Sequence, residues 1–259
     1  MTPALELRDM NKTFGGVQAI ADVSFTVEPG TVTALIGPNG AGKTTLFNLI
    51  TNLLPATGGS ASFFGQPIGA LAAEEIASLG VIRTFQTARV FPGMTALENI
   101  AIGAHRMMKV PAWRQMLMTS AARREERSVR ERAERLLDIA GLYAVRDRAA
   151  SELPMGAQKL LEVVRALMAS PKLLLLDEPA AGLNDTETAE LAEMLRAIRD
   201  SGITLLVVEH NMSLVMGVAD RIVVLDAGRI VAAGRPAEIR SNKAVIEAYV
   251  GREEPLGRA

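Results

Sequence analysis

The sequence predicts an α/β fold with a mainly parallel sheet, an antiparallel β edge subdomain and an inserted α-helical subdomain. Short β-branched or leucine-rich runs alternate with longer helical stretches along most of the chain. Three runs, Val32–Ile36, Leu173–Leu176 and Ile203–Val208, lack an alternating polar face, as strands buried on both sides of a parallel sheet do. The earliest and latest runs alternate more, which favours antiparallel edge strands.

The predicted strands follow one another from the N-terminus to the last quarter of the chain. In order they are Leu5–Arg8, Val23–Val27, Val32–Ile36, Ala61–Phe64, Val81–Phe85, Leu173–Leu176, Ile203–Val208, Ile222–Leu225 and Ile230–Ala233. We expect Leu173–Leu176 to lie directly beside Val32–Ile36 in the sheet.

A charged helical segment interrupts the strands between Ala104 and Ala149. Within it, Ala122–Ala133 interleaves arginines and glutamates, which predicts a solvated helix face with i,i+4 ion pairs. A protein-docking role is the alternative interpretation. We expect a single domain over residues 1–259, with the helical subdomain at about residues 87–165 and a frayed tail at residues 253–259.

Composition excludes several classes of protein. The chain has 259 residues, 49% of them apolar, which is enough for a sizeable core and too many for a disordered chain. With 28 basic and 29 acidic residues and few aromatics, it has no electrostatic footprint for duplex DNA or anionic lipid, and nucleic acid is not an expected partner. The absence of cysteine fits a reducing cytoplasm. No signal peptide or spanning segment is visible, so any membrane role is expected to come through partners.

A glycine-rich loop follows the run Val32–Ile36 and opens a predicted helix. It fits the pattern G-x-x-x-x-G-K-S/T, in which successive backbone N–H groups and the helix N-terminus face one phosphate anion. The lysine is then expected to reach the β- and γ-phosphates, and the following hydroxyl is expected to hold Mg²⁺. The residues of this loop are Gly37, Pro38, Asn39, Gly40, Ala41, Gly42, Lys43, Thr44 and Thr45.

Two adjacent carboxylates end the aliphatic run Leu173–Leu176. Such a position lies at the carboxyl edge of a parallel sheet, where ligands of these sheets bind. We expect Asp177 to hold Mg²⁺ and Glu178 to take a proton from an attacking water. By itself, a pair of acids at a strand end is more often a solvated edge, and the glycine-rich loop upstream is what favours catalysis.

His210 follows the apolar run Ile203–Val208, from which it could reach the γ-phosphate. Taken alone it would be interpreted as an ordinary surface histidine. The second histidine, His105, opens the helical segment and has no such context.

Taken together, these motifs resemble the ATP-binding-cassette (ABC) ATPases, which are P-loop NTPases that bind ATP and Mg²⁺. The resemblance extends from Leu5 to about Gly251. It also includes the strand ending at Gln86, the helix start at Leu153–Gln158 and the phrase Ala181–Asn184. The likeness implies an ATPase that powers transport across a membrane through dimerisation.

The resemblance assigns further roles within the site. Phe14 takes the position of the aromatic residue that stacks on adenine, with Ala19 also near the base. Gln86 corresponds to the residue that touches Mg²⁺ and the attacking water and reports the nucleotide state to a membrane partner. Asn184 corresponds to the loop that contacts the second ATPase subunit.

Within the family, the helical insert and the phrase Glu209–Met212 resemble the larger ATPase of branched-chain amino acid importers. This likeness implies a second ATPase subunit in a heterodimer, transmembrane permease subunits and, indirectly, an extracytoplasmic solute-binding protein. The chain would then sit in the cytoplasm, peripheral on the inner face of the membrane. Urea or amide importers, lipid exporters and soluble non-transport ABC ATPases are the alternatives.

The family's signature, usually Leu-Ser-Gly-Gly-Gln, differs here. Its serine and glycine N–H groups contact the γ-phosphate that is bound by the other subunit. Pro154 offers neither a hydroxyl nor an N–H, so two phosphate donors are missing. In a dimer, this signature contributes to the ATP site of the partner subunit. We therefore expect the partner's site to hydrolyse ATP more slowly than the site built by Lys43 and Glu178. Gln158 could supply a replacement donor. The corresponding residues are Leu153, Pro154, Met155, Gly156, Ala157 and Gln158.

Overall fold

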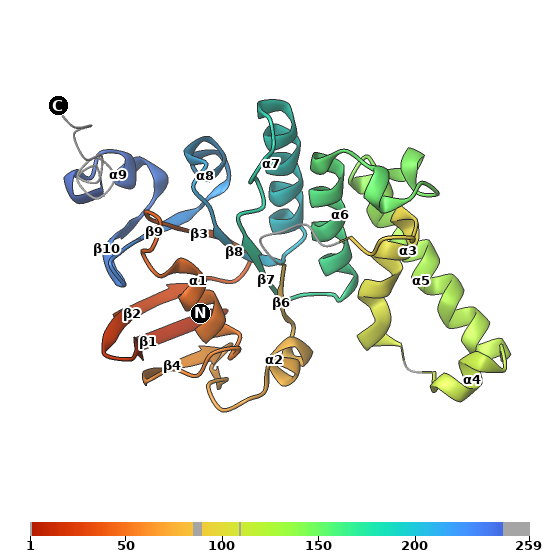
Figure 1. The fold of residues 1–259 in the computed structure, drawn as a ribbon, viewed down its shortest axis with the longest axis horizontal. Helices are drawn as coiled ribbons and strands as arrows, with labels where there is room; N and C mark the ends of the chain where they lie inside the picture. The colour runs from red at the N-terminus through yellow and green to blue at the C-terminus, as the bar shows by residue number, and fades with distance from the viewer. Residues whose placement is uncertain (1, 85–89, 109, 246–259) are drawn as a thin grey trace. The chain divides into compact units, whose positions relative to one another are not determined.

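The computed structural model describes residues 2–84, 90–108 and 110–245 (Figure 1). Its backbone divides into two compact units. The first contains residues 1–83, 172–180 and 195–259, and the second contains residues 84–171 and 181–194.

All the strands of the described residues lie in the first unit. They are β1 (Leu5–Phe14), β2 (Val17–Val27), β3 (Val32–Ile36), β4 (Gly58–Phe63), β5 (Gln66–Pro67), β6 (Val81–Arg83), β7 (Leu173–Asp177), β8 (Thr204–Val208), β9 (Arg221–Asp226) and β10 (Arg229–Gly234). A four-stranded antiparallel sheet has the order β2-β1-β4-β5, and a six-stranded sheet has the order β10-β9-β3-β8-β7-β6. Strands β9, β3, β8, β7 and β6 are parallel, and β10 pairs antiparallel with β9, so the predicted fold class is confirmed.

Three details differ from the sequence-based expectation. The hairpin strands β1 and β2 are longer than predicted, because residues 9–14 and 17–22 continue the pairing through irregular register shifts. The predicted strand Val81–Phe85 ends at Arg83, and Phe85 lies outside the described residues. The expectation that Leu173–Leu176 lies beside Val32–Ile36 was wrong: β8 lies between them and pairs with both β3 and β7.

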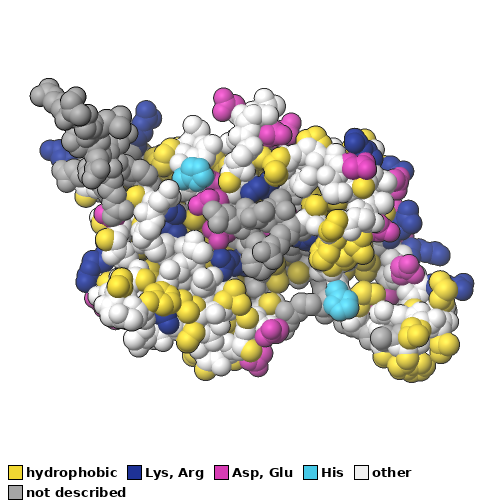
Figure 2. Space-filling model, in the orientation of Figure 1, with side chains coloured by type: hydrophobic (Ala, Val, Ile, Leu, Met, Phe, Trp, Pro, Cys, Tyr) yellow, Lys and Arg dark blue, Asp and Glu magenta, His cyan; other side chains and the backbone are white. Residues whose placement is uncertain are grey.

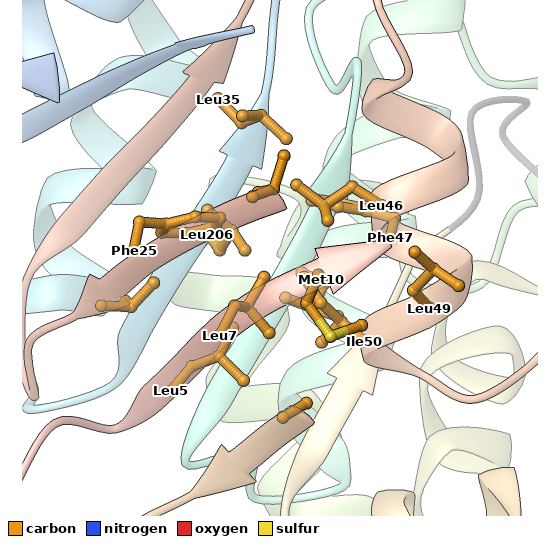
Figure 3. Close-up of a cluster of buried hydrophobic side chains, with 14 of the residues drawn as sticks. Leu5, Leu7, Met10, Phe25, Leu35, Leu46, Phe47, Leu49, Ile50 and Leu206 are labelled. Carbon is orange, nitrogen blue, oxygen red and sulfur yellow. The ribbon is translucent and has the colours of Figure 1, made fainter. Parts of the chain in front are cut away.

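Strands β3, β7 and β8 are buried along their whole length, as their uninterrupted apolar character predicts. One face of the six-stranded sheet packs with β1, β2 and the helix α1 (Lys43–Ile50) around Phe47, Leu46 and Leu206 (Figure 3). The other face packs with α8 (Met212–Val218) and α9 (Pro236–Arg240). Helix α2 (Ala73–Leu79) precedes β6.

The described part of the second unit is helical. It contains α3 (Ala96–Ala101), η1 (Ile102–Met107), α4 (Ala112–Met116), α5 (Ser120–Ile139), η2 (Tyr143–Val145), η3 (Ala150–Glu152) and α6 (Met155–Met168). Helix α7 (Asp185–Asp200) begins in this unit and ends in the first. Along α5, Arg130 and Glu134 form the expected kind of i,i+4 pair at 3.0 Å, while Ala133 and Leu137 are buried. Within the described residues, no helix combines the length and apolar character needed to cross a bilayer.

Candidate active site

The glycine-rich loop connects β3 to α1 in a conformation that requires glycine at two points. Gly42, at φ +103°, is the N-cap of α1, and a Cβ there would lie 2.8 Å from Ile20 Cδ1 and 2.9 Å from the carbonyl oxygen of Ala19. A Cβ on Gly37 would collide with the carbonyl oxygen of Leu225. The loop is therefore packed tightly on β2 and the end of β9.

The turn after β9 fixes this loop from behind. Gly228 donates its N–H to the carbonyl of Ala41 at 3.0 Å, and its own carbonyl accepts the N–H of Ala21 at 2.9 Å. The predicted base-side residue Ala19 thus lies next to the phosphate loop, at Gly42. This support is built by residues far apart in the sequence.

Lys43, the first residue of α1, folds over the loop. Its Nζ donates to the carbonyl oxygens of Gly37 at 2.7 Å and Pro38 at 2.9 Å. Burial lowers the pKa of this ammonium group, and the nearby carboxylates of Glu178 and Asp177 oppose the shift. The structure therefore brings the predicted phosphate lysine close to both predicted acids.

Asp177, the last residue of β7, is 3% exposed and is held by Arg83. The Arg83 Nη2 donates to Asp177 Oδ2 at 2.9 Å, and its Nη1 donates to Asn48 Oδ1 on α1 at 2.6 Å. Arg83 thus ties together β6, β7 and α1. Sequence reasoning missed this residue, although a charged residue ending an apolar strand was the available signal.

Glu178 stands at the strand end in a backbone conformation that L-residues rarely adopt, at φ +48°. Its N–H donates to the carbonyl of Val208 at 2.9 Å, so the turn after β7 is fastened to the end of β8. Such local strain is common at functional sites, where the surroundings impose it.

A second buried carboxylate, Glu209, organises the same region and was also missed as a site residue. Its Oε1 accepts the N–H of Ala180 at 2.7 Å, and its Oε2 accepts the N–H groups of His210 at 2.9 Å and Asn211 at 3.0 Å. The carboxylate is fully buried and links the turn after β7 to the turn after β8. An acidic residue directly after the apolar run Ile203–Val208 was the available signal.

His210 lies at the end of β8, the strand next to β3. Its Nδ1 is 4.0 Å from Glu178 Oε2 and 3.9 Å from Glu209 Oε2, and its side chain is 59% exposed. Because β3, β7 and β8 are parallel, Lys43, Glu178 and His210 all follow the carboxyl ends of their strands at one edge of the sheet (Figure 1).

The donor set fits a nucleotide with Mg²⁺. Among the described residues, no three His, Cys, Asp or Glu side chains gather into a metal-binding group. Mg²⁺ is usually held by one or two carboxylates together with substrate phosphates, so Asp177 and the exposed Thr44 suit it. Gln86, the third predicted ligand, lies outside the described residues.

Phe14 is at the end of the β1–β2 hairpin, where it pairs with Val17. Phe14 is 46% exposed, and Lys12 Nζ lies 5.0 Å from the centroid of its ring. An exposed aromatic ring suits stacking on the adenine base of a nucleotide. The lysine beside the ring suits the negative charge of the nucleotide's phosphates.

The divergent signature lies in the second unit. Pro154 is the N-cap of α6, without a side-chain hydrogen bond. Gln158 Nε2 donates to the carbonyl oxygens of Leu153 at 2.8 Å and Ser151 at 3.4 Å. The side-chain amide of Gln158 therefore donates inside the loop itself, which disfavours Gln158 as a replacement phosphate donor.

Gly156 of the signature packs against α7. A Cβ at this position would collide with the carboxylate of Glu187, whose Oε2 accepts the N–H of Asn184 at 3.0 Å. The Asn184 Oδ1 in turn accepts the N–H of Glu187 at 3.0 Å. The two segments expected to face a second subunit are thus joined through Glu187.

Comparison with known proteins places the chain in a family. The model of the ABC transporter family matches residues 20–181, and a model of branched-chain amino acid ATP-binding cassette transporters matches residues 229–255. Over 250 residues, the chain is 42% identical to the high-affinity branched-chain amino acid transport ATP-binding protein LivG of Salmonella typhimurium, covering 96% of this chain and 98% of LivG. It is also 42% identical to BraF of Pseudomonas aeruginosa, a protein of the same description, with the same coverage.

Solved structures agree with this relationship. The ADP conformation of MJ1267, an ATP-binding cassette of an ABC transporter, superposes with a TM-score of 0.85 at 34% identity, covering 97% of this chain and all of the other. A nucleotide-free ATP-binding cassette from an ABC transporter gives a TM-score of 0.84 at 35% identity, with 96% of this chain and all of the other covered. The chain therefore belongs to the ATP-binding subunits of the ABC transporter family, P-loop ATPases coupled to transport.

Proposed function

We propose that this chain is the ATP-hydrolysing subunit of an importer of branched-chain amino acids. The observation that carries the ATPase role is the gathering of Lys43, Asp177 and Glu178 at one sheet edge, next to a phosphate loop that only glycine can build. The names of LivG and BraF, together with the match at residues 229–255, support the solute class.

In this proposal the loop amides and Lys43 bind the triphosphate and balance its charge. Phe14 stacks on the adenine, with Ala19 beside it. Thr44, Asp177 and Gln86 would hold Mg²⁺, which, when bound, neutralises charge on the β- and γ-phosphate oxygens.

Glu178 accepts a proton from the water whose oxygen attacks the γ-phosphorus. The bond between the γ-phosphorus and the β–γ bridging oxygen breaks, and that oxygen leaves as part of ADP. His210 follows β8, the strand beside β7, and from there it contacts the γ-phosphate and orients it for the attack. A positioned base contributes about 10²- to 10⁴-fold in rate.

A heterodimer of two ATPase subunits, docked on permease subunits at the inner face of the membrane, would convert this hydrolysis into transport. The signature Leu153–Gln158 and Asn184 would face the partner's nucleotide. Closure and reopening of the dimer would then move the permease helices.

The test is the substitution Glu178→Gln in the assembled transporter. Because the amide cannot take the proton, steady-state hydrolysis at this subunit's site should fall about 10²- to 10⁴-fold while ATP binding and dimer formation remain. Glu28→Gln, at an exposed carboxylate of the same unit, is the matched control and should leave hydrolysis unchanged. Unchanged hydrolysis in Glu178→Gln would eliminate Glu178 as the base.

The solute class is tested separately by uptake of labelled leucine, isoleucine and valine in cells lacking this chain. Loss of that uptake, restored by the chain and not by Glu178→Gln, is the expected result. Loss of urea or amide uptake instead would assign the importer to those solutes.

A further inference from the structure

The short helix α4 turns its apolar face outward. Trp113, Met116 and Leu117 have the i, i+3, i+4 spacing of one helix face, and their exposed fractions are 57%, 85% and 69%. The next residue, Met118, is 59% exposed. The apolar face of a helix in a globular protein normally faces the core, so this apolar patch of four residues indicates contact with something outside the chain.

Polar contacts with α5 fix the segment that carries the patch. Gln115 Nε2 donates to the carbonyl of Val110 at 2.9 Å, and the N–H of Val110 lies 3.3 Å from both carboxylate oxygens of Glu125 on α5. Thr119 caps α5 by accepting the N–H of Ala122 at 3.3 Å. The α4 segment is thus fastened to α5 by its polar groups, while its large apolar side chains remain at the surface.

The charge of this segment differs from that of the whole chain. The chain has a net charge of −1, but residues 99–124 contain five basic residues and no acidic one. The basic residues are Arg106, Lys109, Arg114, Arg123 and Arg124. The near-zero net charge of the complete sequence therefore does not reflect the positive charge of the segment that contains the apolar patch.

A hollow of about 330 Å³ opens behind the patch. It is lined by Met108, Gln115, Met118, Ala122, Arg123 and Glu126. Its lining thus combines two methionines with one basic and one acidic residue. In the space-filling view, hydrophobic side chains gather at the end of the second unit where Figure 1 labels α4 (Figure 2).

We propose that α4 and the first turn of α5 form an interfacial anchor that binds the anionic lipid headgroups of the membrane. This inference rests on the proposed function, which brings the subunit to the inner face of that membrane. Trp113, Met116 and Leu117 enter the headgroup region, and Arg123 and Arg124 pair with lipid phosphates. Tryptophan, long apolar side chains and flanking arginines are the composition of helices that lie in the membrane interface.

A lipid surface fits this composition better than a protein partner does. Protein interfaces are also enriched in tryptophan, methionine and arginine, so the sign of the charge is what separates the two: residues 99–124 contain five basic residues and no acidic one. In the sequence, Glu125 and Glu126 directly follow the segment; the Glu125 carboxylate accepts the N–H of Val110, and Glu126 lines the hollow together with Arg123. Anionic headgroups supply the opposite charge that the segment lacks.

The chain carries its own probe for the test. Trp113 is the single tryptophan of the sequence, so its fluorescence reports the patch directly. The purified full chain is mixed with phosphatidylcholine vesicles that either contain or lack phosphatidylglycerol, and vesicle flotation is measured on the same samples. We expect a blue shift and co-flotation only with phosphatidylglycerol, both weakened by added salt.

Substitutions separate the apolar from the electrostatic contribution. The double substitution Met116→Ser and Leu117→Ser should weaken vesicle binding by about tenfold or more, because two apolar side chains no longer enter the interface. Arg123→Gln should weaken it by about fivefold. Ile139→Ser, at a 70% exposed residue of the same unit, is the matched control and should bind like the unmodified chain.

The proposal is overturned if vesicles containing phosphatidylglycerol produce no shift or flotation, or if the double variant binds as tightly as the unmodified chain. A Trp113 shift that requires the permease would also overturn it and would assign the patch to protein contact. ATP hydrolysis by the assembled transporter is measured in parallel, so failure of the lipid proposal remains distinguishable from failure of the ATPase proposal.

Discussion

At the scale of single residues, the candidate site depends on buried charged groups that hold one another. Arg83 is the connecting residue, because its guanidinium bonds Asp177 on β7 and Asn48 on α1 and lies 5.4 Å from the centre of the Phe47 ring. Its side chain is 10% exposed and that of Asp177 is 4% exposed. Asp177 is therefore held in one orientation by a partner that water screens little.

Replacing Arg83 by Met should be strongly destabilising. The substitution leaves the Asp177 carboxylate buried without its cation, for which a loss of about 3–5 kcal/mol in the free energy of unfolding is typical. Urea unfolding followed by circular dichroism measures the change. Arg130→Met, which removes a cation from the exposed pair with Glu134, is the control and should change stability little. Similar losses for the two variants would contradict the assignment of Arg83.

Glu209 positions the residues on either side of the candidate base. Replacing it by Gln exchanges one carboxylate oxygen for an NH₂ group, which cannot accept hydrogen bonds. The backbone N–H groups that now donate to this carboxylate lose an acceptor, so the turn that carries His210 should shift. We expect kcat for ATP hydrolysis to fall about tenfold or more, since a charge-assisted hydrogen bond contributes about 1.5–3 kcal/mol, with the Kd for ATP nearly unchanged. Glu238→Gln, which alters a carboxylate bonded to the N–H of Arg235 at an exposed helix start, is the control and should keep the same kcat.

At the scale of elements, helix α3 begins with a capping box. Thr95 Oγ1 accepts the N–H of Glu98 at 3.2 Å, and Glu98 Oε2 accepts the N–H of Thr95 at 2.8 Å. The hydrogen bonds from the backbone N–H of Thr95 and then from its hydroxyl lower the pKa of the Glu98 carboxyl below its ordinary value. The folded chain therefore binds this proton less readily than the unfolded chain does.

This shift gives the capping box a pH dependence of definite sign. The stabilisation is present above the ordinary glutamate value of about 4.5 and is lost as the pH falls through the lowered pKa. Glu98→Gln should thus be less stable than the unmodified chain at neutral pH, and the difference should shrink as the solution is acidified below that value. Chemical unfolding of both chains at neutral pH and at a pH below 4.5 measures this difference in stability. Thr95→Ser, which keeps the hydroxyl, is the control. An equal difference in the free energy of unfolding at both pH values would show that the Glu98 carboxylate does not stabilise the helix start.

At the scale of the whole molecule, the divergent signature predicts unequal sites in an assembled heterodimer. Pro154 carries no donor, and the Gln158 side-chain amide donates to carbonyl oxygens within the loop. The site completed for the partner should therefore turn over more slowly than the site built by Lys43 and Glu178.

Pro154→Ser should restore the missing donors. In a heterodimer whose own site is silenced by Glu178→Gln, the remaining turnover should rise about ten- to a hundredfold, because two hydrogen bonds to a charged phosphate are regained. The serine should also cap α6 and raise stability by about 0.5–2 kcal/mol, which unfolding measures independently. Pro67→Ser on β5 is the control for loss of a proline. Turnover that stays at the level of the Pro154 chain would show that the missing donors do not limit the partner's site.

Local pattern was enough to predict the fold class and the glycine-rich loop. Strands β3, β7 and β8 are uninterrupted apolar runs, and both the loop and the acids Asp177 and Glu178 are adjacent in sequence to a strand end. These features are local, because a short run of consecutive residues specifies both its backbone conformation and its chemistry.

Only the tertiary structure decided which residues hold that chemistry in place. Strand order placed β8 between β3 and β7, and so brought Glu209 to the turn that carries Glu178. Arg83 meets Asp177 across 94 positions of the chain. No periodicity encodes such pairs, because they form only when the sheet assembles and buries the charges together, and the outward face of α4 was likewise decided by packing and not by its sequence.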